Sequence, residues 1–340
     1  MERLRSLLTA SKVPGAVACW GGPDGQQLLA HGVTRLGGPA VTADTRFDLA
    51  SLTKVVAALP AILLLVSEGE LELDRPLKHW FSNIGSGQTP SLSEATVRQL
   101  LAHNSGLRAY SRVHTITRDR LVALASTLQT PLDWEPGSGT AVYSDVGFML
   151  LGALVERVTG QRLDEFVRER ITGPLGMGAS HYNPLDGEPE PADYAATEHC
   201  GWRNRLLIGE VHDENTVAWE GVSGHAGLFG TAADLAAYCR AWLTLDARLG
   251  SAELLREATH EQARTKEGER RGLGWVVGPA AFGGDLPGFG HTGYTGTSLW
   301  LDLDSARFAV LLTNRVHPNR HVLPGITELR AQFHRFVWDS

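Results

Sequence analysis

The stretch FDLASLTKVVAALPAILLLVSEG, residues 47–69, places a serine and a lysine three positions apart at the head of a strongly apolar run. The run predicts a helix from about Ser51 to Glu68 that stops at Gly69, a residue type that often ends helices. The whole chain has 4 lysines and 27 arginines, so a lysine at position 54 among valines and alanines needs a specific reason. Because residues three apart share one face of a helix, we expect Ser51 and Lys54 to lie within hydrogen-bond reach.

Serine and lysine at this spacing are residue types that suit covalent catalysis. A serine hydroxyl is a weak nucleophile until a base removes its proton, and a desolvated neutral amine can be that base. Arginine cannot replace the lysine, because its guanidinium stays protonated in proteins. For the four-residue match alone, the commoner explanation is an N-cap serine followed by a lysine that extends its amine to solvent. Other motifs are needed to decide between a catalytic pair and a helix cap.

Composition limits the class of protein. The 340 residues exceed a usual single-core domain, and 43% hydrophobic with 20% charged residues is typical of a soluble globular protein. A net charge of −7 without a Lys/Arg block argues against a nucleic-acid partner. The three cysteines, Cys19, Cys200 and Cys239, are an odd and widely spaced set, which argues against a disulfide framework and fits a reducing compartment.

The apolar runs bear on localisation. Residues 1–16 lack the apolar core of a secretory signal. The longest apolar stretch, 55–66, contains Pro60 and is too short to span a bilayer. The sequence therefore predicts a cytoplasmic protein without a membrane partner; an export signal trimmed from the chain is the alternative that stays open.

Hydrophobic periodicity predicts strands at both ends of the chain and helices in the middle. The predicted strands are 15–20, 27–33, 272–278, 297–303 and 307–314. Besides the helix that begins at Ser51, the predicted helices are about 146–159, 163–171, 231–243 and 326–337.

This order of elements predicts an α+β fold with two lobes. Residues 1–69 and 221–340 would form a discontinuous domain, an antiparallel sheet flanked by the terminal helices. Residues 70–220 would form a mostly helical inserted domain, loop-rich over 178–220, with the linker-like run NPLDGEPEPAD at 183–193. A cleft between two lobes is where a small-molecule site is expected.

Two further motifs contain residues that suit an active site. YSDVGF, residues 143–148, puts a tyrosine and two short polar residues at a predicted helix entrance, and HTGYTG, residues 291–296, precedes a predicted strand. Small residues in the second motif let a ligand backbone approach a strand edge closely. Taken singly, the tyrosine is explained as a half-buried core aromatic and the second motif as a glycine-rich turn.

In this order, the three motifs resemble the S-x-x-K, S-D-N and K-T-G set of class A β-lactamases and penicillin-binding proteins. A leading tyrosine in the second motif and a leading histidine in the third make the chain similar to the branch of class C β-lactamases and D-alanyl-D-alanine carboxypeptidases, which includes many serine esterases. The resemblance covers nearly the whole chain and implies a two-lobe β-lactamase/transpeptidase-like fold. Its segments are FDLASLTK (47–54), LLAHNSGL (100–107), YSDVGFMLLG (143–152), GHAGLFGTAADLA (224–236) and GHTGYTGTSLWLD (290–302).

The resemblance implies roles for individual residues. Ser51 would be the acylated nucleophile, Lys54 its proton acceptor, and Tyr143 the group that shares the proton and passes it to the leaving group. Lys54 would then need a pKa lowered by burial and by its polar or cationic neighbours. The backbone N–H groups of Ser51 and Tyr294 would form an oxyanion hole.

The same resemblance implies a substrate-binding strand, with two departures from the usual pattern. His291, Thr292 and Gly293 would line the strand against which the acyl side of the substrate lies. Asp145 stands where the family usually has an asparagine, and an ionised aspartate cannot donate to a substrate carbonyl. His291 stands where lysine is usual, so a carboxylate preference should strengthen below about pH 6.5. Both departures weaken a β-lactamase assignment.

The loop-rich residues 196–216 contain several groups that can bind metals: Glu198, His199, Cys200, His212, Asp213 and Glu214. No zinc-finger or H-E-x-x-H spacing is present, so we favour a hydrogen-bonded loop over the cleft, with a metal site as the alternative. A similar loop in some serine hydrolases makes Trp202, Arg203 and His212 candidates for substrate contacts.

Two more histidines belong to the resembling segments. His225 is expected either to reach the cleft or to stabilise a turn, and His103 to be structural within the helical lobe.

We therefore expect a serine hydrolase that forms an acyl-enzyme with a small ester or amide. Esterase or D-amino-acid carboxypeptidase activity is favoured over β-lactamase activity. The alternative is a penicillin-recognising binding or sensor protein that acylates without efficient turnover. No cofactor or metal is expected, the partner is a small-molecule substrate, and the sequence leaves the oligomeric state open.

Overall fold

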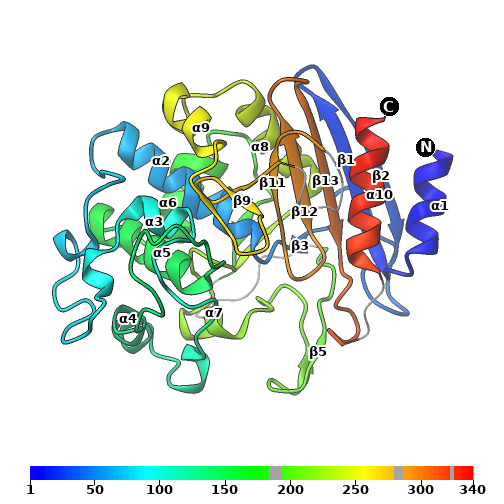
Figure 1. Ribbon diagram of the computed structural model, residues 1–340. Coiled ribbons are helices and arrows are strands. Elements are labelled where there is room, and N and C mark those ends of the chain that lie inside the picture. The colour runs from blue at the N-terminus through cyan, green and yellow to red at the C-terminus, as the bar shows by residue number, and fades with distance from the viewer. Residues whose placement is uncertain (184, 186–192, 279–285, 322–324, 340) are drawn as a thin grey trace.

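The computed structural model describes residues 1–183, 185, 193–278, 286–321 and 325–339. Its main feature is an eight-stranded sheet in the order β2-β1-β13-β12-β11-β10-β9-β8, in which neighbouring strands are antiparallel (Figure 1). The strands are β1 (Gly15–Gly22), β2 (Gly25–Gly32), β8 (Ala263–Arg264), β9 (Arg270–Arg271), β10 (Val276–Val277), β11 (Phe289–Thr292), β12 (Ser298–Asp302) and β13 (Arg307–Thr313).

The two ends of the chain meet in this sheet. β1 pairs with β13, from Ala16 opposite Thr313 to Gly21 opposite Phe308. The α+β class and the antiparallel sheet built from both ends of the chain are therefore confirmed. The division into domains at residues 69/70 and 220/221 stays a prediction.

The terminal helices α1 (Glu2–Ala10) and α10 (Ile326–Trp338) lie side by side on one face of the sheet (Figure 1). Successive side chains of a strand point to opposite faces. Alternate residues of β1 therefore meet these helices, in a buried cluster that contains Ala16, Ala18, Trp20, Leu4, Leu8, Leu329 and Phe333. This cluster fixes α10 over the central strands.

The opposite face of the sheet packs against α8 (Ala232–Leu243), which contacts β1, β12 and β13. The intervening residues of β1, Val17 and Cys19, belong to the main hydrophobic cluster on this side. Thr231 caps α8, because its side chain accepts a hydrogen bond from the Asp234 N–H at 3.2 Å. The main core therefore lies between the sheet and the helices.

The predicted helix after the serine is present but irregular. It consists of a π-helical turn, η1 (Lys54–Ala58), followed by α2 (Leu59–Ser67). Pro60 favours the wider turn, because proline has no N–H and clashes with the carbonyl one α-helical turn earlier. In a π turn the carbonyl of Val55 would accept from the N–H of residue 60, which proline lacks. This carbonyl accepts a hydrogen bond from the Tyr238 hydroxyl of α8. Single π turns of this kind are frequent at functional sites.

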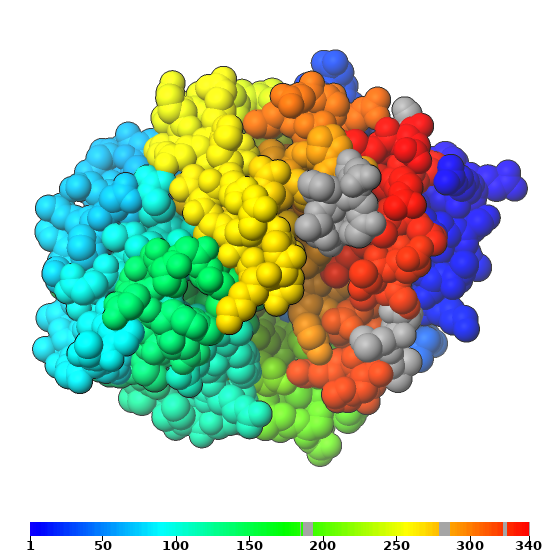
Figure 2. All heavy atoms as spheres, viewed as in Figure 1, coloured from blue at the N-terminus to red at the C-terminus, as the bar shows by residue number. Residues whose placement is uncertain are grey.

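The remaining helices lie mainly beside the sheet. In Figure 2 the segments coloured cyan and green occupy one side of the molecule, and the chain ends in blue, orange and red occupy the other. Among the described residues, no helix is both long and apolar enough to cross a bilayer. The helices are α3 (Val97–Leu101), α4 (Arg120–Leu128), α5 (Asp145–Thr159), α6 (Leu163–Val167) with the π-helical turn Arg168–Thr172, α7 (Glu214–Ala218) and α9 (Ala252–Ala258).

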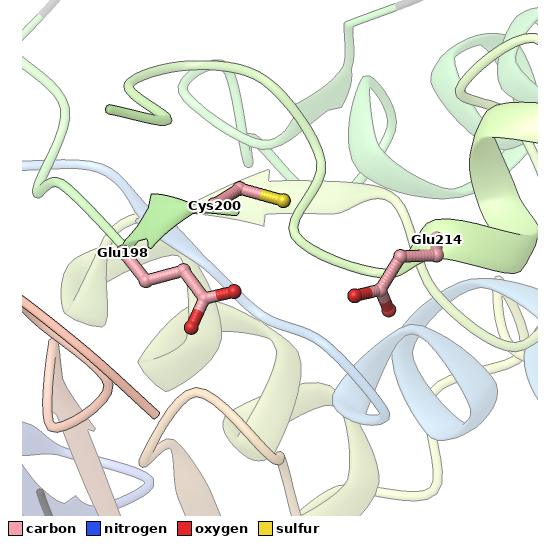
Figure 3. Close-up of side chains that lie close together, drawn as sticks. All are labelled: Glu198, Cys200 and Glu214. Carbon is pink, nitrogen blue, oxygen red and sulfur yellow. The ribbon is translucent and has the colours of Figure 1, made fainter. Parts of the chain in front are cut away.

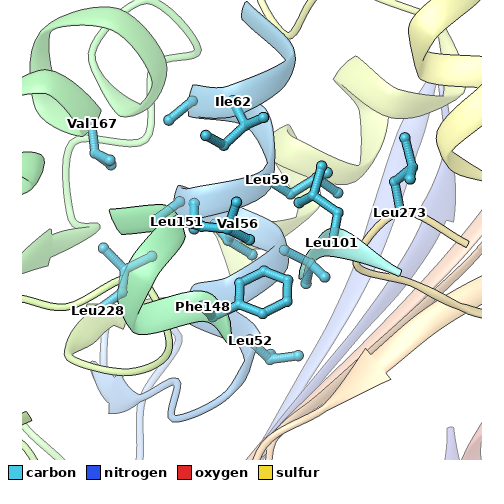
Figure 4. Packing of buried hydrophobic residues seen from close by; sticks show 14 of the residues in the cluster. Leu52, Val56, Leu59, Ile62, Leu101, Phe148, Leu151, Val167, Leu228 and Leu273 are labelled. Carbon is cyan, nitrogen blue, oxygen red and sulfur yellow. The ribbon is translucent and has the colours of Figure 1, made fainter. Parts of the chain in front are cut away.

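α5 packs directly against the helix of the serine. Leu52 and Val56 of that helix meet Phe148 and Leu151 of α5 in the main core (Figure 4). These side chains are fully buried, and close-packed interiors resist displacement. The packing therefore sets how the start of α5 lies relative to the start of the serine helix.

Short strands build the region between the lobes. A three-stranded sheet has the order β3 (Phe47–Asp48), β7 (Leu228–Gly230), β4 (His181–Tyr182), and a separate hairpin pairs β5 (His199–Cys200) with β6 (Arg205–Leu206). Most of the linker predicted at 183–193 lies outside the described residues.

The predicted strand 272–278 is the main difference from expectation. Only Val276 and Val277 pair as a strand, in β10. The preceding residues form a turn instead, in which the Gly272 N–H donates to the Trp275 carbonyl at 2.9 Å and Gly274 has a φ of +78°. A residue in the left-handed conformation interrupts the pleated backbone of a strand, so the strand is shorter than the apolar run predicted.

Candidate active site

Ser51 lies on a tight turn between β3 and its helix. The preceding Ala50 has a φ of +47°, a left-handed conformation that is costly for a residue with a Cβ. The buried Asp48 stabilises the turn, because its Oδ1 accepts a hydrogen bond from the Ala50 N–H at 2.8 Å. Its Oδ2 accepts a second from the His212 N–H at 2.7 Å, which ties the turn to the 196–216 loop.

The turn after β11 packs on the same segment. Thr295 Oγ1 donates to the Asp48 carbonyl at 2.7 Å, and Thr297 Oγ1 donates to the Leu49 carbonyl at 3.0 Å. A Cβ on Gly293 would lie 2.6 Å from the Leu49 carbonyl oxygen, so this close approach requires glycine. The HTGYTG motif thus places residue 294 beside the serine turn.

The two backbone N–H groups predicted to bind an oxyanion belong to Ser51 and Tyr294. Within the described residues, neither has a hydrogen-bond acceptor. Both residues line the same two cavities. Vacant, pre-oriented donors are what an oxyanion hole requires, and the role stays a prediction.

Lys54 is fully buried, and its Nζ contacts three oxygen atoms. It lies 3.2 Å from Ser51 Oγ, 2.7 Å from Asp145 Oδ1 and 3.1 Å from the His225 carbonyl. The contact between serine and lysine that the spacing predicts is therefore present. Three oxygen neighbours match the three donors of an ammonium group.

The pKa of Lys54 does not follow our expectation. Burial lowers it, as assumed from the sequence, but the Asp145 carboxylate and then Tyr143 outweigh burial, so the pKa lies above its ordinary value. The expected lowering was wrong because Asp145 was assigned to substrate binding. Instead, Asp145 forms an ion pair with Lys54, whose side chain is fully buried. In the resting protein Lys54 is an ammonium.

Tyr143 reaches the same point from the segment before α5. Ser144 caps that helix by accepting a hydrogen bond from the Gly147 N–H at 3.2 Å, so Tyr143 lies at the helix entrance as predicted. Lys54 Nζ lies 5.0 Å from the centre of the Tyr143 ring. Burial raises the pKa of Tyr143, and the nearby Lys54 and Ser51 offset the increase only in part. At neutral pH Tyr143 is therefore a neutral phenol.

A cavity of about 320 Å³ adjoins Ser51 and is lined by three carboxylates, those of Asp145, Asp213 and Glu214. Each carboxylate already has a partner in the protein. The partners are Lys54 at 2.7 Å, His225 at 2.9 Å and Arg320 at 2.6 Å, respectively. His225 thus reaches this cavity, and its Nδ1 also lies 2.8 Å from Ser223 Oγ in the adjoining turn.

A second cavity, of about 370 Å³, shares Ser51, Tyr143 and Tyr294 with the first. Its wall includes the predicted strand residues His291, Thr292 and Gly293. It also contains three guanidinium groups from distant parts of the chain: Arg271, Arg315 and Arg330. The first cavity is therefore lined mainly by carboxylates with partners in the protein, and the second mainly by guanidinium groups.

Arg271 lines the second cavity and has buried hydrogen-bond donors without a partner among the described residues. It is 7% exposed and pairs with Glu269 through Nη2, while its Nε and Nη1 have no partner among the described residues. Arg330 Nη2 donates to the Gly293 and Thr297 carbonyls at 2.7 Å, whereas its Nε, like two nitrogens of Arg271, has no partner among the described residues. Burial and the neighbouring arginine also lower the pKa of Arg330 to about 9. Buried donors without partners cost energy, which an anionic ligand would offset.

His291 does not supply the pH-dependent charge that we expected. It is 2% exposed, and its Nδ1 lies 2.8 Å from the Thr292 carbonyl. Burial, and then the charges of Arg271 and Lys54, hold the pKa of His291 well below its ordinary value. His291 is therefore neutral around pH 6.5, so the charge on which we based stronger carboxylate binding below that pH is absent.

The three arginines were missed by sequence reasoning. Arg271 is in β9, Arg315 follows β13, and Arg330 is in α10. No spacing links positions so far apart, and 27 arginines in the chain give none of them prominence. Their common feature is the tertiary structure, which brings them to one cavity.

Of the three loop residues predicted to contact substrate, only His212 lines a described cavity. Trp202 packs edge-on against His114 of the helical lobe, with ring centres 5.6 Å apart. Arg203 donates to backbone carbonyls of residues 211–213, with the shortest contact at 2.6 Å. Trp202 and Arg203 thus stabilise the loop and its contact with the helical lobe.

Part of the group of possible metal ligands does converge. Glu198, Cys200 and Glu214 face one another (Figure 3), and one potential ligand atom of each lies within 4.8 Å of the others. Arg320 pairs with both carboxylates, at 2.5 Å from Glu198 and 2.6 Å from Glu214. His212 Nε2 also lies 3.3 Å from Glu198 Oε1, so both carboxylates have partners in the protein, as the predicted hydrogen-bonded loop requires; the choice between that loop and a metal site stays a prediction.

Comparisons with known proteins agree with this geometry. A family model described as Beta-lactamase matches residues 2–332. A protein of Escherichia coli O157:H7, named provisionally as a D-alanyl-D-alanine carboxypeptidase, is 34% identical over 327 residues, which cover 86% of this chain and 73% of that protein.

Two solved structures have the same fold. The octameric penicillin-binding protein homologue from Pyrococcus abyssi matches with a TM-score of 0.79 at 21% identity, over 98% of this chain and 77% of that one. The D-amino acid amidase from Ochrobactrum anthropi SV3, solved with D-phenylalanine, matches with a TM-score of 0.79 at 20% identity, over 99% and 98%. They confirm the predicted two-lobe fold.

Proposed function

The chain belongs to the β-lactamase family of serine hydrolases, and we propose that it cleaves a small ester or amide through a covalent acyl-enzyme on Ser51. The observation that carries the proposal is the position of Lys54 Nζ, 3.2 Å from Ser51 Oγ and buried among acceptors. Tyr143 and the two vacant N–H groups adjoin the same serine.

Acylation requires Lys54 in its neutral form. Ser51 Oγ would bond to the substrate carbonyl carbon while its proton passes to Lys54 Nζ, and the carbonyl oxygen becomes an oxyanion beside the N–H groups of Ser51 and Tyr294. Tyr143 would pass a proton to the leaving oxygen or nitrogen, which departs as an alcohol or amine. Water then attacks the Ser51 ester, which releases a carboxylic acid and regenerates the hydroxyl.

The arginines favour a substrate with a carboxylate near the scissile bond. Arg271 lines the cavity that contains Ser51 and His291, and two of its buried nitrogens have no partner among the described residues. A carboxylate accepts from such donors strongly, because both partners are charged. We therefore propose a carboxypeptidase-like preference for amides whose leaving amino acid carries a free carboxylate, with weaker activity on neutral esters.

β-Lactamase activity is expected to be weak. Asp145 forms an ion pair with Lys54 and has no N–H to donate to an amide carbonyl of the substrate. The other function considered, a penicillin-recognising protein that acylates without turnover, makes a different prediction about adduct lifetime.

One experiment separates these functions. The protein and its Ser51→Ala variant are incubated with a fluorophosphonate or a penicillin, and intact mass is recorded over time. Turnover is measured in parallel on p-nitrophenyl acetate, nitrocefin and a peptide ending in D-Ala-D-Ala. Fluorophosphonate labelling that requires Ser51, together with ester or peptide turnover, supports the hydrolase. A persistent penicillin adduct without turnover supports the binder, and no labelling at Ser51 contradicts both.

A further inference from the structure

His103 is a buried titratable residue that the proposed chemistry does not use. It follows α3 in the LLAHNSGL segment, is 2% exposed and has a φ of +59°. A histidine in this left-handed conformation is strained, and such strain persists only where the surroundings impose it. The position therefore calls for a specific explanation.

The backbone on both sides of Tyr143 is held by this one residue. The His103 carbonyl accepts a hydrogen bond from the Val142 N–H at 2.8 Å, and its Nδ1 accepts one from the Ser144 N–H at 3.0 Å. A ring nitrogen that accepts is unprotonated, so the proton of a neutral imidazole is on Nε2. Residues 142 and 144 are thus both fixed to position 103.

The imidazole also packs against the reactive side chain itself. The ring centres of His103 and Tyr143 are 4.8 Å apart, with 37° between the planes. The other close neighbours of the Tyr143 ring are His291 at 5.8 Å, the Arg271 guanidinium at 5.3 Å and Lys54 Nζ at 5.0 Å. Only His103 among these residues also bonds to the backbone next to Tyr143.

The charges around His103 keep its ring in the accepting form. Burial, and then Arg271, Lys54 and His291, hold the pKa of His103 well below its ordinary value. A protonated ring would lose the acceptor at Nδ1 and break the bond from Ser144. The hydrogen bond is therefore maintained at neutral pH.

We propose that His103 is a positioning residue for Tyr143, whose ring packing and Nδ1 acceptor hold the phenol against Ser51 and Lys54. The proposal rests on the proposed function, because the position of Tyr143 affects the rate only if Tyr143 transfers protons. A misplacement of about 1 Å at such a group lowers the rate about 10²-fold.

Two substitutions separate the acceptor from the ring. His103→Asn keeps an acceptor oxygen near the position of Nδ1 and suits a left-handed backbone, whereas His103→Phe keeps an aromatic ring and removes the acceptor. We expect His103→Phe to lower kcat for p-nitrophenyl acetate about 10²-fold with little change in KM. His103→Asn should recover most of that loss, to within about tenfold of the parent.

Leu107→Ala is the matched control for a purely structural effect. Leu107 lies in the same LLAHNSGL segment and is 1% exposed, but it belongs to the hydrophobic core. This variant should lose thermal stability by a margin similar to that of the His103 variants while its kcat stays near the parent value.

A double-mutant cycle with Tyr143→Phe tests whether the effect passes through the phenol. In that background the His103 substitutions should lower the rate by less than about threefold, because the positioned group is already absent. Should His103→Phe not fold, His103→Asn supplies the cycle. A folded His103→Phe protein with the parent kcat, or losses that multiply fully in the cycle, would overturn the proposal. Absence of Ser51 labelling in the parent protein would instead contradict the proposed function.

Discussion

The two cavities that share Ser51 differ in how their charges are used. In the first, the carboxylates of Asp145, Asp213 and Glu214 are each paired with a group of the protein. In the second, Arg271 is 7% exposed and keeps two nitrogens without a partner among the described residues. A charged group whose partners lie in the protein has little bonding capacity left for a ligand, whereas a buried donor without a partner gains free energy when an acceptor binds to it.

This difference indicates what each side contributes. The first cavity acts on Lys54, the proposed proton acceptor, because its Asp145 carboxylate raises the pKa of that lysine. We propose that the second cavity binds an anionic group of the substrate. The following substitutions test that separation.

The largest effect is expected at Lys54, which adjoins the serine and balances the Asp145 charge. Lys54→Met should lower the rate of ester cleavage by about 10³-fold or more, because the proton acceptor for Ser51 is lost. Pre-steady-state kinetics with p-nitrophenyl acetate measures this rate. The control is Lys78→Met, since Lys78 is exposed and pairs with Glu94 on the surface. Cleavage at full rate by the Lys54 variant would refute the mechanism.

The second largest effect is expected at Arg271 and only with some substrates. Arg271→Gln should lower kcat/KM about 10- to 100-fold for a peptide with a free terminal carboxylate, because a charged hydrogen bond to the carboxylate is lost. For a neutral p-nitrophenyl ester the loss should be less than about threefold.

Arg270→Gln is the control for that measurement, since Arg270 is the neighbouring residue and pairs with Glu261 on the surface. Equal losses on charged and neutral substrates would show that Arg271 does not bind the carboxylate.

Substitution of Asp145 is expected to increase the rate near neutral pH several-fold, whereas the substitutions above lower it. The carboxylate raises the pKa of Lys54, so the active neutral amine appears only as pH rises through that pKa. In Asp145→Asn burial dominates and the pKa falls, so the acid limb of kcat/KM should move to lower pH and the rate near neutral pH should increase. A pH–rate profile measures the limb. Asp133→Asn, at an exposed carboxylate paired with Arg108, should leave it in place.

The smallest effect is expected when pH is changed, because the pKa of His291 is held well below its ordinary value. If this ring titrated near neutral pH, binding of a carboxylate substrate would improve as pH fell. We expect instead that the ratio of kcat/KM for a carboxylate-bearing peptide and a neutral ester stays within about twofold between about pH 5.5 and 7.5. A ratio that rises as pH falls would instead indicate that His291 becomes protonated and binds the substrate carboxylate.

Local patterns were enough to predict much of this protein. The three-residue spacing of Ser51 and Lys54 placed their polar atoms in contact, and the cap at Ser144 placed Tyr143 at the entrance of α5. Short apolar runs predicted the strands near the two ends of the chain, including β1 and β13. The error at residues 272–278 arose where a glycine turn interrupts an apolar run.

Local patterns could not predict which distant residues meet in the fold, or the charge of a buried side chain. Helix and strand periods are properties of neighbouring residues, so they identify a motif wherever the chain carries it. The grouping of Arg271, Arg315 and Arg330 depends instead on how distant elements pack, and no period connects them. The charge of Lys54 depends on burial against an aspartate 91 residues away, and the balance of those two terms exists only in the folded chain.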